Sequence, residues 1–452
     1  MAQLHFYGGV GTVTGANFLL AAGETRILID CGLIQGERFA QAMNREPFPY
    51  DPRTVGTLIV THAHIDHIGR IPKLVRDGFS GIIYSTEETL ALARLMLPDA
   101  FFVLRSETPE GKDLLYDEAD IERAFSLWKT VSYHERTAVG DFEFVLLDSG
   151  HILGSAMVEF TAKGGTRKLV VTGDLGNAPT PLLKPAERVA DAAYLVMESV
   201  YGDRTHEAGD ERKQRLAAAI SRAAAKKGTL LIPCFSLEKT QVLLFELDSL
   251  LGEARIPKIP VFLDSPLAIK VTDVYRAFRR QLNGDVQHEL QRGNDPFTFP
   301  NLKMTMDASE GKTIDREPPP KIIIAGSGMS SGGRILEHER RHLGDTNNMV
   351  LFIGYQAVGS LGRQIQDGAK SVRINHEDVR VRARIETISG YSSHMDSDHL
   401  LEFAATGEGV TERIYVVMGE PKAALFLAQR IRDYLGIEAQ VPELGEIAEI
   451  EL

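Results

Sequence analysis

Apolar runs that stop at small or polar residues recur along the first half of the chain, and this pattern predicts strands that end in loops. They lie at residues 5–6, 17–20, 26–29, 58–60, 142–147, 157–161, 169–171 and 194–197. Helical patterns cover residues 86–97 and 117–131, and the second would hold the only tryptophan, Trp128. The first half of the chain is therefore expected to alternate strands with helices.

A different pattern begins after residue 204. Apolar runs at residues 229–233, 259–264 and 321–325 alternate with helical patterns at residues 211–227, at residues 238–251 and from Ser265 onward. Three strand–helix alternations predict a parallel α/β unit. Residues 294–320, rich in proline and polar side chains, are expected to form a long loop.

Four potential metal ligands stand close together directly after the apolar run at residues 58–60: His62, His64, Asp66 and His67. Neutral imidazole and carboxylate oxygen suit Zn²⁺, with Mn²⁺ or Fe²⁺ as poorer fits. In an extended backbone His62 and His64 point the same way and can hold one ion together, whereas Asp66 and His67 lie past the bend and can reach a second ion. The alternative is a polar loop without a role, but a helix or strand gains nothing structural from this composition.

Further ligand types follow other predicted strands. Asp30, His151, Asp174 and His394 each come shortly after an apolar run. An Asp in that setting is more often a turn former or a helix cap, so each one alone is a weak signal. Together with the first cluster they form a candidate metal constellation.

This set of motifs resembles the metallo-β-lactamase superfamily and, within it, the β-CASP nucleases, which include the nuclease subunit of the eukaryotic pre-mRNA 3′-end cleavage factor. The His-x-His-x-Asp-His motif is shared by the whole superfamily. The narrower likeness rests on the segments at residues 198–202, 326–334 and 390–394. The resemblance implies an α/β fold: an αββα sandwich with an inserted parallel α/β domain. It divides the chain into an N-terminal sandwich part (1–206), a β-CASP insert (207–365) and a C-terminal sandwich part (366–452).

The resemblance also implies roles for single residues. A first Zn²⁺ would be held by three histidines and a second by one aspartate and two histidines, with one aspartate bridging the two ions. These sets are His62, His64 and His151, then Asp66, His67 and His394, then Asp174. Mn²⁺ is an alternative to Zn²⁺. Asp30 would orient the ligand loop by accepting hydrogen bonds. His394 favours RNA, because the DNA-processing branch of the family usually carries Val there.

The sequence indicates the residues for proton transfer and substrate binding less clearly than the metal ligands. Glu198 would orient a proton donor by pairing with a neighbouring His, and His376 is selected for that role. The alternatives are that His376 is merely solvated, and that metal-bound water or Arg334 assists the leaving group. Lys239 stands where the family more often has Arg, and it would contact phosphate as a point charge. The substrate-binding residues implied by the resemblance are Lys239, Ser327, Ser330 and Arg334.

Composition narrows the class of protein only modestly. The 452 residues are 43% hydrophobic and 25% charged, which is ordinary for a globular protein. No apolar run approaches the ~18 residues of a membrane span, and the N-terminus does not look like a secretion signal. Cys31 and Cys234 are the only cysteines, so a reducing cytoplasm is expected. The net charge of −12 argues weakly against a nucleic-acid partner and predicts modest affinity. A monomer and a weak homodimer both stay open.

The resulting functional hypothesis is a zinc-dependent ribonuclease that cuts single-stranded RNA by a two-metal hydroxide mechanism, as an endonuclease with 5′ exonuclease action as an additional mode. A hydrolase of small esters or thioesters is disfavoured, because a long insert suits a polymer. A non-enzymatic RNA-binding scaffold would have lost ligands, and all seven are present here. A DNA nuclease is disfavoured by His394.

Overall fold

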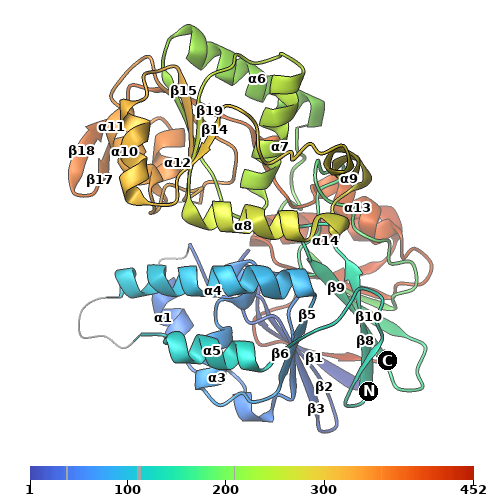
Figure 1. The fold of residues 1–452 in the computed structure, drawn as a ribbon. Helices are drawn as coiled ribbons and strands as arrows, with labels where there is room; N and C mark the ends of the chain where they lie inside the picture. The colour runs from blue at the N-terminus through green and yellow to red at the C-terminus, as the bar shows by residue number, and fades with distance from the viewer. Residues whose placement is uncertain (37–38, 109–113, 208, 358) are drawn as a thin grey trace. The chain divides into compact units, whose positions relative to one another are not determined.

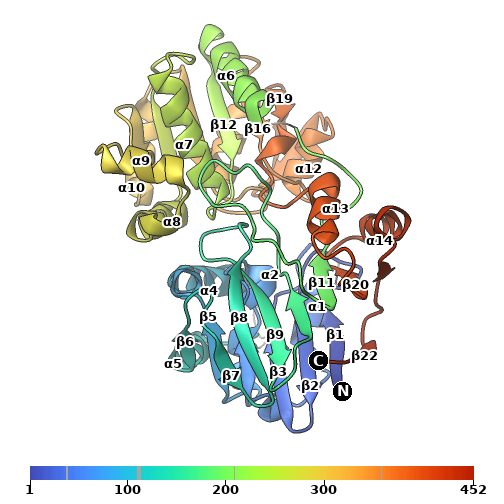
Figure 2. The ribbon, with the colours of Figure 1, turned by 90° about the vertical axis from the view of Figure 1, so that its right-hand side faces the viewer.

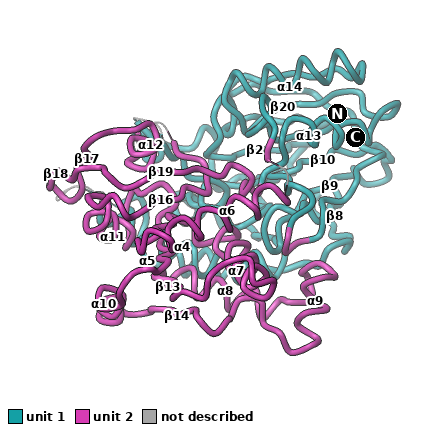
Figure 3. The backbone as a smooth tube through the Cα atoms, turned by 90° about the horizontal axis from the view of Figure 1, so that it is seen from above, with its two compact units in different colours: residues 1–180, 184–205, 394–452 teal, residues 181–183, 206–393 magenta. Residues whose placement is uncertain are grey.

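The computed structural model describes residues 1–36, 39–108, 114–207, 209–357 and 359–452. The chain forms two compact units, which Figure 3 colours separately. Unit 1 contains residues 1–180, 184–205 and 394–452, and unit 2 contains residues 181–183 and 206–393. Both termini therefore belong to unit 1, and unit 2 is almost entirely one continuous insertion.

Two seven-stranded sheets form the centre of unit 1, and Figure 2 shows strands of both. The first has the order β22-β1-β2-β3-β4-β5-β6, with β22 (Ile447–Ile450), β1 (Ala2–Gly8), β2 (Asn17–Ala22), β3 (Thr25–Ile29), β4 (Thr57–Ile59), β5 (Ile82–Ser85) and β6 (Trp128–Thr130). The second has the order β21-β20-β11-β10-β9-β8-β7, with β21 (Glu438–Gln440), β20 (Arg413–Val417), β11 (Tyr194–Glu198), β10 (Lys168–Val171), β9 (Ala156–Ala162), β8 (Phe142–Asp148) and β7 (Thr137–Val139). Strands far apart in sequence are thus neighbours in each sheet.

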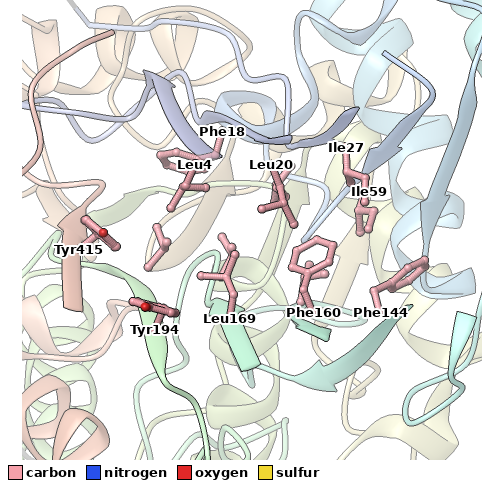
Figure 4. Packing of buried hydrophobic residues seen from close by; sticks show 14 of the residues in the cluster. Leu4, Phe18, Leu20, Ile27, Ile59, Phe144, Phe160, Leu169, Tyr194 and Tyr415 are labelled. Carbon is pink, nitrogen blue, oxygen red and sulfur yellow. The ribbon is translucent and has the colours of Figure 1, made fainter. Parts of the chain in front are cut away.

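The main core of unit 1 lies between these two sheets. Alternate residues of each strand point inward, as the period of two requires, and Figure 4 shows Leu4, Phe18 and Leu20 facing Phe160 and Leu169. All five side chains are at most 2% exposed. Removing Phe160 from such a core would cost roughly 3–5 kcal/mol. The sandwich therefore rests on the apolar alternation that the sequence displays.

Helices cover the outer faces of the sandwich and complete its αββα layers (Figure 1). They are α1 (Ala40–Arg45), α2 (Ile65–Ile68), α3 (Ile71–Arg76), α4 (Glu87–Glu107), α5 (Glu118–Ser126), α13 (Ser397–Ala405) and α14 (Pro421–Leu435), with a 3-10 turn, η1 (Pro52–Thr54). A second apolar cluster packs α13 and α14 against the outer face of the second sheet. The predicted sandwich is confirmed.

Two predicted helices of unit 1 have different ends. The helix predicted to stop at residue 97 continues to Glu107 with Pro98 inside it. The helix predicted over residues 117–131 ends at Ser126, and Trp128 instead begins β6. The reason is tertiary: β6 pairs in parallel with β5, and the indole Nε1 of Trp128 donates to Ser85 Oγ at 2.9 Å. Helix propensity depends on residues that are close in sequence, so it cannot predict that pairing.

Unit 2 is built on a six-stranded sheet of order β14-β13-β15-β12-β16-β19, in which every pairing is parallel. Its strands are β12 (Thr229–Pro233), β13 (Val261–Asp264), β14 (Leu302–Met304), β15 (Lys321–Ala325), β16 (Met349–Phe352) and β19 (Arg384–Thr387), and β17 (Ser371–Ile374) and β18 (Glu377–Arg380) form a separate hairpin. The helices are α6 (Gly209–Ala225), α7 (Lys239–Gly252), α8 (Pro266–Ala277), α9 (Gly284–Gln291), α10 (Ala308–Arg316), α11 (Ile335–His342) and α12 (Leu361–Gln366), with 3-10 turns η2 (Arg279–Gln281) and η3 (Ser389–Tyr391). The predicted parallel α/β insert is confirmed.

Unit 2 differs from the sequence expectation in two respects. Residues 294–320 are not one long loop, because they contain β14, which pairs with β13, and α10, which begins with a capping box formed by Asp307 and Glu310. The compact unit also extends to residue 393, whereas the insert was expected to end at residue 365. The extra segment belongs there because β19 completes the parallel sheet beside β16. Within the described ranges, none of the helices combines the length and apolarity needed to cross a bilayer.

Candidate metal centre

Four ligand atoms of unit 1, from three buried residues and one half-buried residue, face one another at the ends of strands from both sheets. His62 and His64 lie in the loop after β4, His151 in the loop after β8, and Asp174 just after β10. His64 Nδ1 lies 3.1 Å from His62 Nε2 and 3.3 Å from His151 Nε2. Asp174 Oδ2 lies 3.4 Å from His62 Nε2 and 3.5 Å from His151 Nε2. We call these four residues the first ligand group.

The spacing of the first ligand group fits a tetrahedral ion. An ion bonded at about 2.0–2.1 Å to each ligand holds neighbouring ligand atoms about 3.3–3.4 Å apart, and the four distances scatter around that value. His62, His151 and Asp174 are at most 2% exposed, so water cannot easily separate the facing lone pairs. Three imidazole nitrogens and one carboxylate oxygen are a donor set that Zn²⁺ accepts.

A second position adjoins the first group. His67 Nε2 lies 3.4 Å from Asp174 Oδ1 and 3.9 Å from Asp66 Oδ2. His67 Nε2 and Asp174 Oδ1 are both buried and have no hydrogen-bond partner. Orphaned buried polar atoms are costly, and a cation between them would remove that cost. We call Asp66, His67 and Asp174 the second ligand group.

Asp30 contacts His67 of the second group directly and His62 of the first group through Thr61. Its carboxylate accepts from Thr61 N and from Thr61 Oγ1, each at 2.8 Å, and contacts His67 Nδ1 at 2.7 Å. The same Thr61 hydroxyl lies 3.0 Å from His62 Nδ1. Thr61 was missed by the sequence analysis, although its place directly before the histidine motif was a usable signal. These contacts leave the opposite nitrogens of His62 and His67 to face the metal positions.

The loop after β3 must pass very close to the ligand helix α2. A Cβ atom on Gly32 would lie 1.5 Å from the carbonyl oxygen of Asp66, so only glycine fits there. Asp30 itself has a left-handed φ of 59°, which is uncommon for a residue other than glycine. Its carboxylate contacts hold it in that conformation, which ties the ligand loop to the sheet.

His394 lies elsewhere than the sequence hypothesis put it. Its Nδ1 is 3.2 Å from both carboxylate oxygens of Glu198, the last residue of β11, and 3.9 Å from Asp174 Oδ2. His394 therefore gathers with Asp174 and Glu198 and does not join Asp66 and His67. The histidine that pairs with Glu198 is His394, whereas His376 was the one selected from the sequence.

Burial and the charges of neighbouring groups shift the pKa values of the side chains in this centre in opposite directions. Burial lowers the pKa of His62, and it lowers the pKa of His64 and His151 much further, so these imidazoles are kept neutral and able to bind a metal. Burial also raises the pKa of Glu198, an effect that His394 partly offsets. His67 differs: burial acts to lower its pKa, but Asp174 and Asp30 together raise it well above the usual value.

The residues expected to contact substrate all belong to unit 2. Two of them bind partners inside the protein, and the other two are partly exposed. Ser330 is buried and donates to Glu339 at 2.6 Å, and Arg334 binds Asp264 and the carbonyls of Thr305 and Met306. Ser330 and Arg334 therefore have internal partners, which the sequence did not reveal.

Lys239 and Ser327 remain partly exposed, and Lys239 Nζ lies 4.4 Å from the centre of the Phe235 ring. Burial lowers the pKa of Lys239 to about 8. His376 is exposed in the turn between β17 and β18, with a left-handed φ of 70°. The sequence hypothesis placed His376 beside Glu198, whereas His394 is the histidine that contacts Glu198.

Three family models match successive parts of the chain. The metallo-β-lactamase superfamily model matches residues 10–233, the β-CASP domain model matches residues 240–365, and the model described as a Zn-dependent metallo-hydrolase RNA specificity domain matches residues 378–442. The four residues of the first ligand group lie inside the first match, and His394 lies inside the third.

Similar proteins cover nearly the whole chain. Ribonuclease TTHA0252 of Thermus thermophilus is 35% identical over 97% of this chain and 98% of its own length. The transcription termination factors FttA of Methanosarcina mazei and Thermococcus kodakarensis are 30% and 31% identical, over 96% of this chain and 69% of their own length. A solved structure of a protein of unknown function from Enterococcus faecalis is 13% identical with a TM-score of 0.56, covers 99% of both chains, and bears on the fold alone.

Proposed function

The chain belongs to the β-CASP group of the metallo-β-lactamase superfamily and is a metal-dependent hydrolase of that group, and we propose that it cuts single-stranded RNA. Cleavage is endonucleolytic, with 5′ exonuclease action as an additional mode. The observation that carries this proposal is the pair of ligand groups joined through Asp174 in unit 1. The RNA specificity domain match and the ribonuclease named among the relatives favour RNA over DNA or a small ester.

The two ligand groups would hold two divalent cations, and Zn²⁺ suits the first. His62, His64, His151 and Asp174 would bind one ion, and Asp66, His67 and Asp174 the other. When bound, such ions act as Lewis acids that neutralise phosphate charge and make water acidic enough to attack at neutral pH. Asp30 and Thr61 hold the imidazoles in the orientation this requires.

Glu198 and His394 supply the proton-transfer step. Nδ1 of His394 donates to the Glu198 carboxylate, which is buried and also accepts from the backbone N–H of Leu175 at 2.6 Å. This fixes the imidazole ring and leaves Nε2 as the nitrogen that gives a proton to the leaving 3′ oxygen of the cut bond. The carboxylate also stabilises the protonated ring before transfer. His394 acts here as a general acid, and Glu198 is a positioning residue.

Lys239 and Ser327 are the proposed phosphate contacts in unit 2. Lys239 carries a charge with an aromatic ring beside it and forms no ion pair with a carboxylate among the described residues, which is a suitable setting for a phosphate. Ser327 follows β15 in a glycine-rich loop whose backbone N–H groups can face an anion.

Cytoplasmic location is proposed on separate grounds, since both cysteines are free thiols.

A substrate panel tests the proposal. The metal-loaded protein is given a 5′-labelled single-stranded RNA, the same sequence as DNA, the RNA in duplex form and a chromogenic ester. Internal cuts confined to single-stranded RNA are expected. Equal cleavage of the DNA strand, or turnover of the ester alone, would contradict the proposal and promote a DNA nuclease or a small-ester hydrolase.

A further inference from the structure

The two ligand groups differ in their donors, and the difference bears on which ions they hold. The first group offers three imidazole nitrogens and one carboxylate oxygen, which already completes a tetrahedron. The second group shares Asp174 with the first and adds one imidazole and one carboxylate. With three protein atoms it leaves several coordination positions to solvent or substrate.

Each group has one partly exposed ligand. In the first group His62 and His151 are 0% exposed and His64 is half-buried, and in the second group His67 is 0% exposed and Asp66 is 21% exposed. Water and phosphate oxygens can therefore reach the second position from the Asp66 side. The difference between the groups is the number of protein ligands, and an ion held by three protein atoms exchanges faster than one held by four.

His394 does not make up the missing ligand in this arrangement. Its Nδ1 faces both oxygens of Glu198, and those oxygens also accept from the backbone N–H groups of Leu175 and Val200. The Glu198–His394 pair is thus satisfied by hydrogen bonds. The orphaned buried atoms, in contrast, are His67 Nε2 and Asp174 Oδ1, and they face each other in the second group.

From these observations we infer that the two positions are not equivalent: the first holds a tight Zn²⁺, and the second holds an exchangeable Mn²⁺ through Asp66, His67 and Asp174 without His394. One imidazole with two carboxylates and open positions suits Mn²⁺, which accepts oxygen ligands and water in an octahedral shell. This inference rests on the proposed metal-dependent function, but it concerns ion binding alone. A substrate phosphate would add ligands to the second ion and not to the first.

The test is a metal titration without RNA. Protein stripped with a chelator is loaded with one equivalent of Zn²⁺ and dialysed, and Mn²⁺ is then titrated while free Mn²⁺ is followed by electron paramagnetic resonance. Retained Zn²⁺ is measured by mass spectrometry. The matched variants are Asp66→Asn and Glu198→Gln, which both replace a carboxylate with an amide of the same size, together with His394→Gln. Thermal unfolding verifies that each variant is folded.

Wild type is expected to retain one Zn²⁺ and to bind one Mn²⁺. Asp66→Asn should weaken Mn²⁺ binding by at least about tenfold while keeping the Zn²⁺, because it replaces a charged carboxylate ligand of the second group with a neutral amide. Glu198→Gln and His394→Gln should stay within about threefold of wild type. Loss of Mn²⁺ binding in His394→Gln or Glu198→Gln, or displacement of the single Zn²⁺ by Mn²⁺ in wild type, would overturn the inference. If metals bind as stated and RNA stays intact, only the proposed function fails.

Discussion

Asp174 in unit 1 and Asp264 in unit 2 occupy similar places and have opposite surroundings. Asp174 follows β10 and Asp264 ends β13, each is at most 3% exposed, and each has a histidine neighbour. Asp264 accepts from Thr305 Oγ1 and Arg334 Nη1 at 2.6 Å and contacts His338 Nε2 at 2.8 Å. Asp174 has an orphaned oxygen, and in the described part of the chain no Lys or Arg forms an ion pair with it.

The difference lies in where the balancing charge comes from. Unit 2 carries its own cation, Arg334, so the Asp264 cluster is complete within the protein. In the Asp174 cluster burial keeps His62, His64 and His151 neutral, and the described residues give Asp174 no Lys or Arg partner. Apart from the proton that His67 can carry, the balancing charge of this cluster therefore comes from cations in solution. A polar cluster at the end of a strand can thus stabilise the fold or bind a metal. A Lys or Arg within the cluster indicates the first role, and the lack of one indicates the second.

The largest effect is expected from Asp174→Asn. This change replaces one of the two bridging oxygens with an amide nitrogen and removes the negative charge that both ligand groups share, so metal binding should fall by more than the roughly 10–100-fold typical of an outer partner, and RNA cleavage should fall with it. Metal addition should raise the Tm of wild type and not that of the variant. Calorimetric metal titration with parallel melting curves measures this. A variant that keeps both ions would contradict the account of the Asp174 cluster.

The matched change in unit 2 is Asp264→Asn. It should lower the free energy of unfolding by about 2–3 kcal/mol, because it weakens charge-assisted hydrogen bonds from Arg334 and His338. The loss should be the same with and without metal. Denaturant unfolding in chelator and in Zn²⁺ checks this, and a metal-dependent loss would mean that the two clusters are not independent.

The Asp264 cluster also predicts that the protein loses stability at acid pH. Burial acts to raise the pKa of Asp264, but hydrogen bonds from His338, Thr305 and Arg334 bring it down to about 2. Since the folded pKa lies below the unfolded value of 3.8, this stabilisation is complete above pH 4 and is lost as pH falls towards 2. Asp264→Asn should therefore show a flatter stability profile between these pH values.

A smaller effect is expected from Asp30→Asn, which leaves every ligand in place. Its carboxylate orients His67 directly and His62 through Thr61. Metal affinity should fall by about 10–100-fold, the usual cost of losing an outer-shell partner. Equilibrium dialysis measures it. If affinity is unchanged, the bonds from Asp30 hold the loop without tuning the metal ligands.

The smallest effect concerns Lys239. Because burial lowers its pKa to about 8, the side chain is charged below that pH and becomes neutral as pH rises through it. Affinity for a non-cleavable 2′-O-methyl oligonucleotide should therefore drop severalfold between pH 7 and 9 in wild type, at the scale of one phosphate contact. Lys239→Arg keeps its charge and should lose this dependence. An identical profile for both would remove Lys239 from the proposed phosphate contacts.

Much of the fold and of the first ligand group could be predicted from sequence. The alternation of His62 and His64 after an apolar strand requires only local geometry, and apolar periodicity indicated both the sandwich and the parallel insert. Trp128 could not be predicted to begin β6, because its strand exists through pairing with β5. Residues 294–320 looked like a loop for the same reason, since β14 depends on β13.

The role of His394 could not be read from its motif. Its type and position after a strand suited a metal ligand, but whether it meets Asp66 or Glu198 is decided by how β11, β10 and α13 are packed. The internal partners of Ser330 and Arg334 depend on Glu339 and Asp264 in the same way. Sequence patterns gave the residue types, and tertiary packing decided which of them meet.

The most direct test of the central claim compares RNA cleavage and metal content in wild type, His394→Ala and His62→Ala, with a 5′-labelled single-stranded RNA. The account predicts that wild type cuts the RNA, that His394→Ala retains its metal but loses most cleavage, and that His62→Ala loses both. If metal-loaded wild type leaves the RNA intact, or if His394→Ala cuts it at the wild-type rate, the account is contradicted.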